Sequence, residues 1–411
     1  MMIINNIETE GYREDMAAPG KSLGLYIHVP FCMKKCNYCD FLSFAGSREE
    51  DHRQYFRSLL REIRLNSKIY SNKYYVDSIF IGGGTPSLVE ADLIRELIAV
   101  VRDCFSVAQN AEISIESNPK TLTEEKLGIY LEAGVNRLSI GAQSFDDELL
   151  NRLGRVHCAE DLLKNYSLAR ACGFRNINLD LMFSVPGQTE PVWLDTLEQA
   201  TALGPEHISF YGLQLEEGTL FSVMHKEGRL KETDDETDRS MYYSAVKLLK
   251  EKGYVHYEIS NAAMEGYQCR HNLKYWSMDD YLGLGLGAHS FLGGVRYSNT
   301  DDLAEYIRIG NNIASQTSRN RTQKPESPFT VWRHQNTKEE NMSEYLFTGL
   351  RKRKGIELAD FKERFGAAPE EIYGDVLKKY QKSGLIEIDG GCLRLTEKGV
   401  DISNGVLAEF I

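Results

Sequence analysis

The chain has 411 residues, of which 42% are hydrophobic and 26% charged, and this ordinary composition for a protein of two or three domains excludes a disordered chain or a small disulfide scaffold. Sixty acidic and 48 basic residues give a net charge of −12, which disfavours general binding to nucleic acid or to an anionic membrane surface. Because no apolar run is long enough for an integral membrane segment and the N-terminus carries no apolar signal segment, we expect a cytoplasmic protein.

From residue 24 onward, strand-like and helix-like segments alternate. The predicted strands cover residues 25–29, 76–81, 111–116, 135–140, 176–183 and 207–213. The predicted helices cover residues 49–70, 89–104, 123–133, 146–153, 159–172, 189–203 and 235–252. Six β–α repeats in series indicate parallel strands with helical crossovers, in an open doubly wound sheet or in a barrel. Both arrangements place the chemistry at the carboxyl ends of the strands.

The character of the chain changes after the polar stretch 315–340, which is typical of a linker or a long loop. The segments beyond it predict helices over 339–352, 358–365 and 369–383, followed by a hairpin of 385–388 and 392–395. This order predicts a small α+β domain that resembles a winged helix. Its basic run, Arg351-Lys-Arg-Lys354, is best explained as a solvated loop, so we predict no binding to nucleic acid.

Three of the eight cysteines, Cys32, Cys36 and Cys39, fall within eight residues just after the first strand. This spacing allows the three thiolates to bind one metal centre. A structural zinc site needs a fourth ligand, which His28 or Asp40 would have to supply. A [4Fe–4S] cluster held by three thiolates instead keeps one iron open for a substrate or cosubstrate. The spacing favours iron–sulfur, with zinc and a site without metal as the alternatives.

The pattern Cys-x3-Cys-x2-Cys resembles the signature of the radical S-adenosylmethionine (radical SAM) superfamily. The flanking residues Tyr26-Ile-His-Val-Pro-Phe-Cys32 and Tyr38-Cys-Asp-Phe41 resemble its oxygen-independent coproporphyrinogen III oxidase-like subgroup. The resemblance extends from Tyr26 into the C-terminal domain. It implies a partial (β/α)6 radical SAM barrel and a [4Fe–4S] cluster on the three cysteines. It also implies that SAM chelates the open iron and that an electron donor reduces the cluster.

The same resemblance assigns the residues that contact SAM. The turn Gly82-Gly-Gly-Thr-Pro86 lets the backbone approach a ligand and leaves N–H groups free to hold it. In the family this turn holds the methionine end of SAM, which implies Gly83, Gly84 and Thr85 here. Glu116, at the end of the third strand, would accept both ribose hydroxyls. The further positions implied for SAM binding are Tyr26, Gln143, Arg155, Asp180 and Leu213.

The segment Cys269-Arg-His271-Asn-Leu-Lys-Tyr-Trp276 places a histidine beside two large aromatic residues. Such a histidine is either an ordinary core or surface residue or an axial heme ligand covered by apolar rings. The sequence His-Asn-x-x-Tyr-Trp resembles the hallmark of the heme-chaperone branch of the subgroup. Members of that branch bind heme and hand it to an acceptor protein. The resemblance implies His271 as the heme ligand, with Cys269 as a rival.

Two features depart from the oxidases. Phe41 stands where they carry a fourth cysteine, and about 24 residues precede the first strand where they have a longer extension. We therefore predict a heme-binding radical SAM protein that acts as a heme chaperone. The alternative is a radical SAM enzyme, either a coproporphyrinogen III oxidase or a related methyltransferase. The negative charge disfavours a third possibility, a metal-stabilised regulatory protein.

The predicted organisation has four parts. These are an N-terminal tail over 1–22, a radical SAM core over 23–260, a flanking segment with the HNLKYW motif over 261–325 and a C-terminal domain over 326–411.

Overall fold

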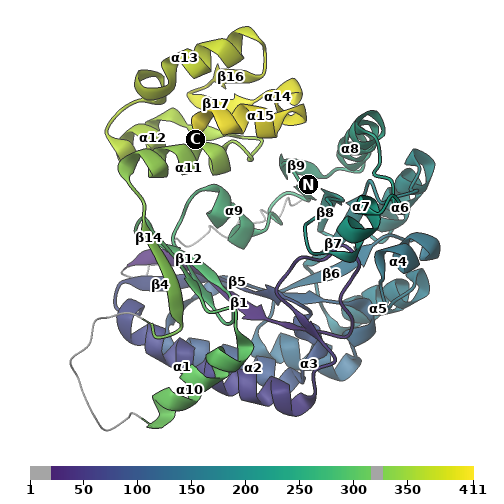
Figure 1. Cartoon of the computed structure of the whole chain (residues 1–411), viewed down its shortest axis with the longest axis vertical. Helices are drawn as coiled ribbons and strands as arrows, with labels where there is room; N and C mark the ends of the chain where they lie inside the picture. Colours follow the sequence, from purple (N-terminus) through teal and green to yellow (C-terminus); the bar gives the residue numbers. More distant parts are fainter. Residues whose placement is uncertain (1–19, 316–326) are drawn as a thin grey trace, which may run out of the picture.

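The structure is a computed structural model that describes residues 20–315 and 327–411. Its centre is a 12-stranded sheet with the strand order β14-β13-β12-β11-β1-β4-β5-β6-β7-β8-β10-β9 (Figure 1). Seven neighbouring strands in this order run parallel, and six of them belong to the β–α repeats of the barrel. The six are β1 (Lys21–Val29), β4 (Tyr74–Gly83), β5 (Ser106–Ser117), β6 (Arg137–Gln143), β7 (Ile177–Phe183) and β8 (His207–Gly212).

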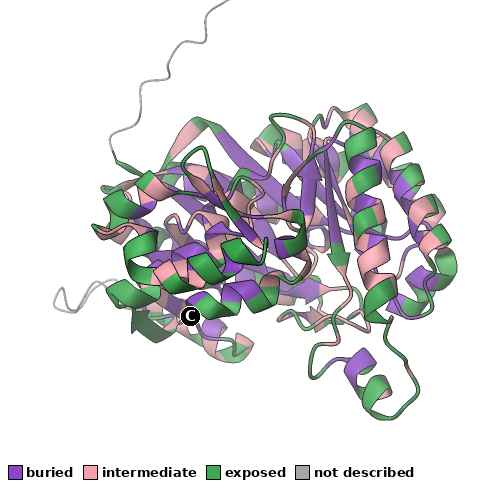
Figure 2. Cartoon of the chain, turned by 90° about the horizontal axis from the view of Figure 1, so that it is seen from above, coloured by how far each residue is buried: buried purple, intermediate pink, exposed green. Residues whose placement is uncertain are grey.

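Helices connect these strands or follow the last of them, and the longer helices cover their outer face. The helices are α1 (Glu49–Tyr70), α2 (Ala91–Cys104), α3 (Glu124–Ala133), α4 (Asp147–Leu153), α5 (Ala159–Cys172), α6 (Glu190–Ala202), α7 (Leu220–Lys226) and α8 (Asp235–Glu251). Figure 2 shows buried residues on the strands and exposed residues on the outward helix faces. Gly134 and Gly173 end α3 and α5 in the left-handed conformation, as their place in the sequence indicates. The predicted α/β class with a partial (β/α)6 barrel is confirmed.

Further strands extend the sheet on both sides of the barrel without closing it. On one side, β11 (Tyr281–Leu284) pairs with β1, and β12 (His289–Leu292), β13 (Val295–Asn299) and β14 (Thr330–Gln335) follow in antiparallel order. On the other side lie β10 (Asn261–Ala263) and β9 (Val255–Glu258). Two helices lie among these strands in the chain: α9 (Arg270–Trp276) between β10 and β11, and α10 (Leu303–Ser315) between β13 and β14.

The predicted linker over 315–340 is wrong for residues 330–335, which form the edge strand β14, while its residues 316–326 lie outside the described part. The strand contains Thr330, Val331 and Trp332, which are β-branched or aromatic. An edge strand pairs on one side only, so it forms here without the apolar alternation that marks a half-buried strand.

The C-terminal part builds a second, smaller unit. It contains α11 (Lys338–Gly349), β15 (Ile356–Glu357), α12 (Leu358–Phe365), α13 (Pro369–Lys382), β16 (Ile386–Asp389), β17 (Cys392–Leu395), α14 (Glu397–Asp401) and α15 (Ser403–Leu407). Gly390 and Gly391 both have positive φ in the β16–β17 turn, as the predicted hairpin requires. The predicted small α+β domain is confirmed. Within residues 20–315 and 327–411, no helix combines the length and the apolar character that crossing a membrane requires.

A buried carboxylate joins α1 to the segment beyond the barrel. Glu62 accepts hydrogen bonds from the Tyr306 hydroxyl on α10 at 2.5 Å, from the Gly285 N–H at 2.9 Å and from the Asn299 amide at 2.6 Å. Burial raises the pKa of Glu62 to about 7. Three donors from two chain segments therefore depend on one side chain for their partner.

We predict that Glu62→Ala lowers the free energy of unfolding by about 3 kcal/mol, because it leaves several buried donors without an acceptor. Equilibrium unfolding in urea measures this loss. Glu96→Ala on the exposed face of α2 is the matched control and should change stability by less than about 0.5 kcal/mol. Equal losses in the two variants would contradict a structural role for the Glu62 network.

Candidate functional site

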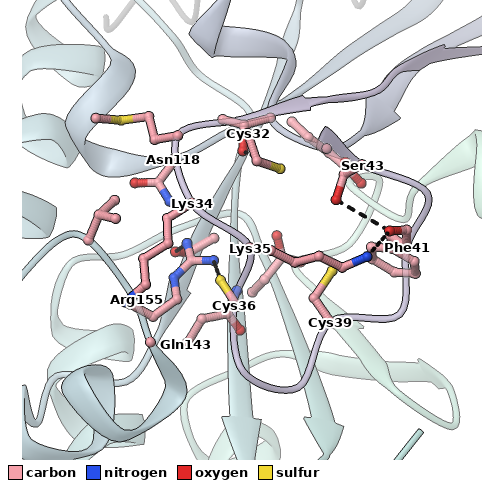
Figure 3. Close-up of a pocket in the computed structure, with 18 of the residues that line it drawn as sticks. Cys32, Lys34, Lys35, Cys36, Cys39, Phe41, Ser43, Asn118, Gln143 and Arg155 are labelled. Atoms are coloured by element: carbon pink, nitrogen blue, oxygen red, sulfur yellow. Dashed lines mark hydrogen bonds between the residues drawn. The ribbon is translucent and has the colours of Figure 1, made fainter. Parts of the chain in front are cut away.

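A pocket of about 350 Å³ lies at the carboxyl ends of the parallel strands (Figure 3). Of the thirteen residues predicted for the site, ten line this pocket. They are Cys32, Cys36, Cys39, Gly83, Gly84, Thr85, Glu116, Gln143, Arg155 and Asp180. The other three, Tyr26, Leu213 and His271, lie outside its lining. The pocket thus gathers residues from the ends of five strands and from the loops that follow them.

The cysteines lie on a loop that the fold anchors at its base and at its tip. At the base, the short strands β2 (Phe31–Cys32) and β3 (Phe44–Ala45) pair with each other. Farther along, the Asn37 N–H donates to the Leu153 carbonyl at the end of α4, at 3.0 Å. The Lys35 ammonium and the Ser43 hydroxyl both donate to the Phe41 carbonyl (Figure 3). The loop is therefore positioned by its own backbone and by a neighbouring helix.

Three thiolates are the donor set of a [4Fe–4S] cluster that keeps one iron open. Within the described residues, no three His, Cys, Asp or Glu side chains converge closely enough to hold a single metal ion. A zinc ion needs all its thiolates about 2.3 Å from one point. In a [4Fe–4S] cluster each thiolate binds its own iron, so the sulfur atoms stand apart. Burial raises the pKa of Cys32, and that of Cys39 to about 11, so metal binding must release these protons.

The glycine turn packs directly against the cysteine loop. The Gly84 N–H donates to the Val29 carbonyl at 2.9 Å, and the Thr85 N–H donates to the Phe31 carbonyl at 2.8 Å. A Cβ on Gly84 would lie 2.7 Å from the Phe31 oxygen, so only glycine fits there. The N–H groups of Gly83, Gly84 and Thr85 all have protein acceptors. The expectation of free donors is therefore wrong, and the turn offers a ligand close backbone approach instead.

Two half-buried carboxylates line the pocket from β5 and β7. Glu116 accepts from the Gly83 N–H at 3.0 Å, and Asp180 accepts from Ser139 at 3.0 Å and from Asn178 at 2.8 Å. These last two are the buried partners that a carboxylate in an apolar strand requires. Burial, and to a smaller extent the charge of Asp180, raises the pKa of Glu116 to about 7. Burial also raises the pKa of Asp180.

Gln143 and Arg155 approach the pocket from the end of β6 and the loop after α4. Gln143 has a φ of 64°, at an irregularity in the β6–β7 pairing, which is an uncommon conformation for a non-glycine residue. Arg155 donates to the Gly141 carbonyl at 2.8 Å and to the Cys36 sulfur at 3.5 Å. Its buried Nε has no hydrogen-bond partner among the described residues, so a donor remains for a ligand carboxylate.

Tyr26 and Leu213 lie next to the pocket. The Tyr26 hydroxyl is 2.9 Å from His28 Nδ1, and the His28 ring lies so close to Gly83 that an added Cβ there would be 2.6 Å from it. Leu213 follows β8, donates its N–H to the Phe183 carbonyl and packs on a small apolar cluster. Both residues stabilise the walls in this structure.

His271 is fully buried, and both of its ring nitrogens have partners. Nδ1 lies 2.9 Å from the Ser78 hydroxyl, and Nε2 lies 2.9 Å from the Tyr275 hydroxyl. Burial lowers the pKa of His271 to about 3, which keeps the imidazole neutral. Its rival Cys269 is buried beside Glu112. Heme ligation by His271 stays a prediction, and it requires these two hydrogen bonds to break.

Several pocket residues were not predicted from the sequence, among them Asn118, Met182 and Tyr211 at or near strand ends. Two of them lie two residues beyond Glu116 and Asp180. Because side chains two residues apart in a strand share a face, the alternation could have identified them.

Comparison with known proteins gives two family matches. Residues 26–200 match the Radical SAM superfamily, and residues 336–402 match the HemN C-terminal domain. Among solved structures, the coproporphyrinogen III oxidase (HemN) from Escherichia coli, a radical SAM enzyme, superimposes with a TM-score of 0.80. The match covers 96% of this chain and 91% of that one, at 21% sequence identity. At this identity it shows a shared fold.

Curated relatives match over nearly the full length. The heme chaperone HemW of Bacillus subtilis is 36% identical over 388 residues, which cover 94% of this chain and 98% of the relative. The heme chaperone HemW of Haemophilus influenzae is 34% identical over 399 residues, which cover 95% and 98% of the two chains. These matches show that the chain belongs to the family of the heme chaperone HemW, within the radical SAM superfamily.

Proposed function

We propose that this protein is a heme chaperone that carries a [4Fe–4S] cluster, binds SAM and transfers heme to an acceptor protein. The similarity to proteins named heme chaperone HemW, over almost the whole of both chains, carries the proposal. Phe41 favours the chaperone proposal over the alternative of a coproporphyrinogen oxidase. This side chain, 63% exposed at the pocket rim, stands where the oxidases carry a fourth cysteine.

Different pocket residues would bind the two cofactors, the cluster and SAM. The thiolates of Cys32, Cys36 and Cys39 hold the cluster, which supplies the electron that SAM cleavage requires. Arg155 would donate its unpartnered Nε–H to the carboxylate of SAM, and Gly83 and Gly84 would let that end of SAM approach the backbone. Glu116 accepts the ribose hydroxyls. The tight packing of the glycine turn on the cysteine loop supports this assignment, since it brings the two ends of the site together.

A radical SAM enzyme acting on a porphyrinogen, or a related methyltransferase, is the second candidate. The observation that favours it is the pocket, in which the residues for radical chemistry lie together. The cytoplasmic location, the heme acceptor and the electron donor to the cluster are further parts of the proposal.

We predict that replacing any one of Cys32, Cys36 and Cys39 by alanine abolishes the brown chromophore after anaerobic reconstitution with iron and sulfide. Three thiolates leave no spare ligand, so each loss opens a second iron. Absorption spectra and iron analysis measure the cluster content. Cys172→Ala on α5 is the control and should reconstitute like the wild type. Retention of a full cluster by all three pocket variants would contradict the assignment.

We predict that Glu116→Gln weakens SAM binding at pH 8 by about 1–3 kcal/mol, because a carboxylate accepts stronger hydrogen bonds from the ribose hydroxyls than an amide does. The pKa of about 7 makes wild-type affinity fall as pH drops from 8 to 6, since protonation removes the acceptor. Calorimetric titration across this range measures the effect. The glutamine variant should show a flatter profile, and identical profiles would exclude Glu116 as the titrating group.

We predict that the wild type binds heme stoichiometrically and that His271→Ala loses or shifts the Soret band. The neutral imidazole is the form that ligates iron. Heme titrations followed by absorption spectroscopy test both points. Cys269→Ala and the exposed His289→Ala should both retain the wild-type spectrum.

Two outcomes of these titrations, and one outcome of an activity assay, differ in meaning. Unchanged spectra in His271→Ala would remove His271 as a ligand and leave the chaperone proposal standing. Absence of heme binding by the wild type would contradict the chaperone proposal. Robust conversion of coproporphyrinogen III under reducing, SAM-replete conditions would favour the enzyme.

A further inference from the structure

A second cavity, of about 500 Å³, adjoins the cysteine pocket. The two share four lining residues, Tyr38, Cys39, Phe41 and Tyr211. The far wall of the second cavity comes from β9, α9 and the segment just after α11. Figure 1 shows α9 between the sheet and α11. The second cavity therefore lies where the barrel meets the C-terminal unit.

Four residues that line this cavity carry unpartnered polar atoms. Glu258 Oε2, Asn261 Oδ1, Trp276 Nε1 and Arg351 Nε are buried in or behind its wall and have no hydrogen-bond partner among the described residues. The Glu258 and Asn261 side chains belong to residues that are only 0% and 3% exposed. Buried polar groups in native proteins nearly always have partners, so a concentration of four in one cavity points to a ligand.

The HNLKYW motif divides between two faces of α9. Asn272, Tyr275 and Trp276 line the second cavity. His271 and Lys274 are buried on the barrel side, where Lys274 pairs with Asp77 at 2.9 Å. The spacing of three and four residues explains why the first set shares a face. The motif thus presents an aromatic, hydrogen-bonding surface to the cavity and fixes the helix from behind.

Arg351 reaches the cavity from the basic run that the sequence suggested was solvated. This expectation is wrong for Arg351, whose side chain is only 24% exposed. Its carbonyl accepts from the Ile259 N–H at 3.2 Å. Its guanidinium lies 4.4 Å from the centroid of the Trp276 ring and 3.9 Å from Glu258. The guanidinium is therefore held in the cavity wall between an aromatic face and a carboxyl.

We propose that this second cavity binds the carboxylate edge of a planar aromatic macrocycle, through the Trp276 indole N–H and the Arg351 guanidinium. Resting on the proposed function, the macrocycle is heme and the carboxylates are its propionates. Arginine and indole N–H groups donate to carboxylates, and the exposed rings of Phe41 and Tyr211 offer apolar surface to the macrocycle.

The charges around the cavity agree with this orientation. Asp40 and Glu216 lie on its exposed rim, which disfavours carboxylates there and directs them inward to Arg351. Burial raises the pKa of Glu258, so this carboxyl holds its proton more readily and repels a propionate less. His271 Nε2 lies 2.9 Å from the hydroxyl of Tyr275, a residue that lines the cavity, so ligation of the heme iron by His271 requires this hydroxyl to move aside.

The test compares heme with heme dimethyl ester, in which both propionates are blocked. Each is titrated into the reconstituted full-length wild type and into Trp276→Phe, Arg351→Met and the control Trp332→Phe. The phenylalanine variant keeps an aromatic ring and removes only the N–H. Trp332 lies on the edge strand β14, outside the lining of the second cavity.

We expect the wild type and Trp332→Phe to prefer heme over its ester by about tenfold or more, the scale for a hydrogen bond to a charged group. Both cavity variants should lose affinity for heme by a similar factor while binding the ester as the wild type does. The preference for the free acid should therefore collapse in these two variants.

The remaining outcomes overturn the inference in distinguishable ways. If both cavity variants keep the wild-type preference for heme, or lose affinity for heme and ester equally, Trp276 and Arg351 do not bind the carboxylates. The proposal that the protein binds heme is unaffected by either result. If the wild type binds neither compound, the proposed function fails and the inference fails with it. Ester binding by the variants reports that their cavity is folded.

Discussion

The parallel pairing of β1 with β4 is the constraint on which the site depends. It places Val29 opposite Gly83, and the backbone bonds that continue it tie the glycine turn to the first residues of the cysteine loop. The pairing of β4 with β5 then sets Ile81 opposite Ile115, so Glu116 reaches the Gly83 N–H. A slip of one residue would turn Glu116 to the other face of the sheet.

The barrel interior is polar along its length, which links the cysteine pocket to α9. The buried Arg137 lies near Glu112 and Asp180, and their negative charges help to keep its pKa raised although desolvation lowers it. Glu112 accepts from the N–H groups of Arg270 and His271 at the start of α9. Buried charges of this kind are stable only while their partners remain, so the same network that orients Asp180 also fixes the helix carrying HNLKYW.

The sequence predicted the strands and main helices of the barrel well because each has a local cause, whereas β9 to β13, α9 and α10 were not predicted. The helix over 49–70 begins and ends where its periodicity indicates, and the helix over 159–172 ends at its predicted glycine stop, Gly173. Most pocket residues could also be predicted from the sequence, since the ends of parallel strands meet at one edge of the sheet. Side-chain direction was harder to predict. Leu213 follows its strand and faces an apolar cluster, because the direction of a residue beyond a strand depends on packing.

Tertiary contacts explain the remaining differences. In the seven residues of α9, periodicity is too short to tell which face is buried, and contacts with β4 decide that His271 points inward. The composition of the basic run indicated no partner for its side chains. In the folded protein the Arg351 guanidinium packs on the Trp276 ring. Strand β14 was missed for the same reason, because its formation depends on pairing with β13, a tertiary contact that its own sequence does not reveal.

The incomplete barrel leaves its sheet with two edges, and the C-terminal unit covers part of one. Along β9, Glu258 forms a bridge with Lys352, and the Arg353 N–H donates to the Tyr257 carbonyl at 2.9 Å. An uncovered strand edge is a template for pairing with another chain. The segment that brings Arg351 to the second cavity therefore also guards the protein against aggregation, and a chain shortened before this segment would expose a strand able to recruit its neighbours.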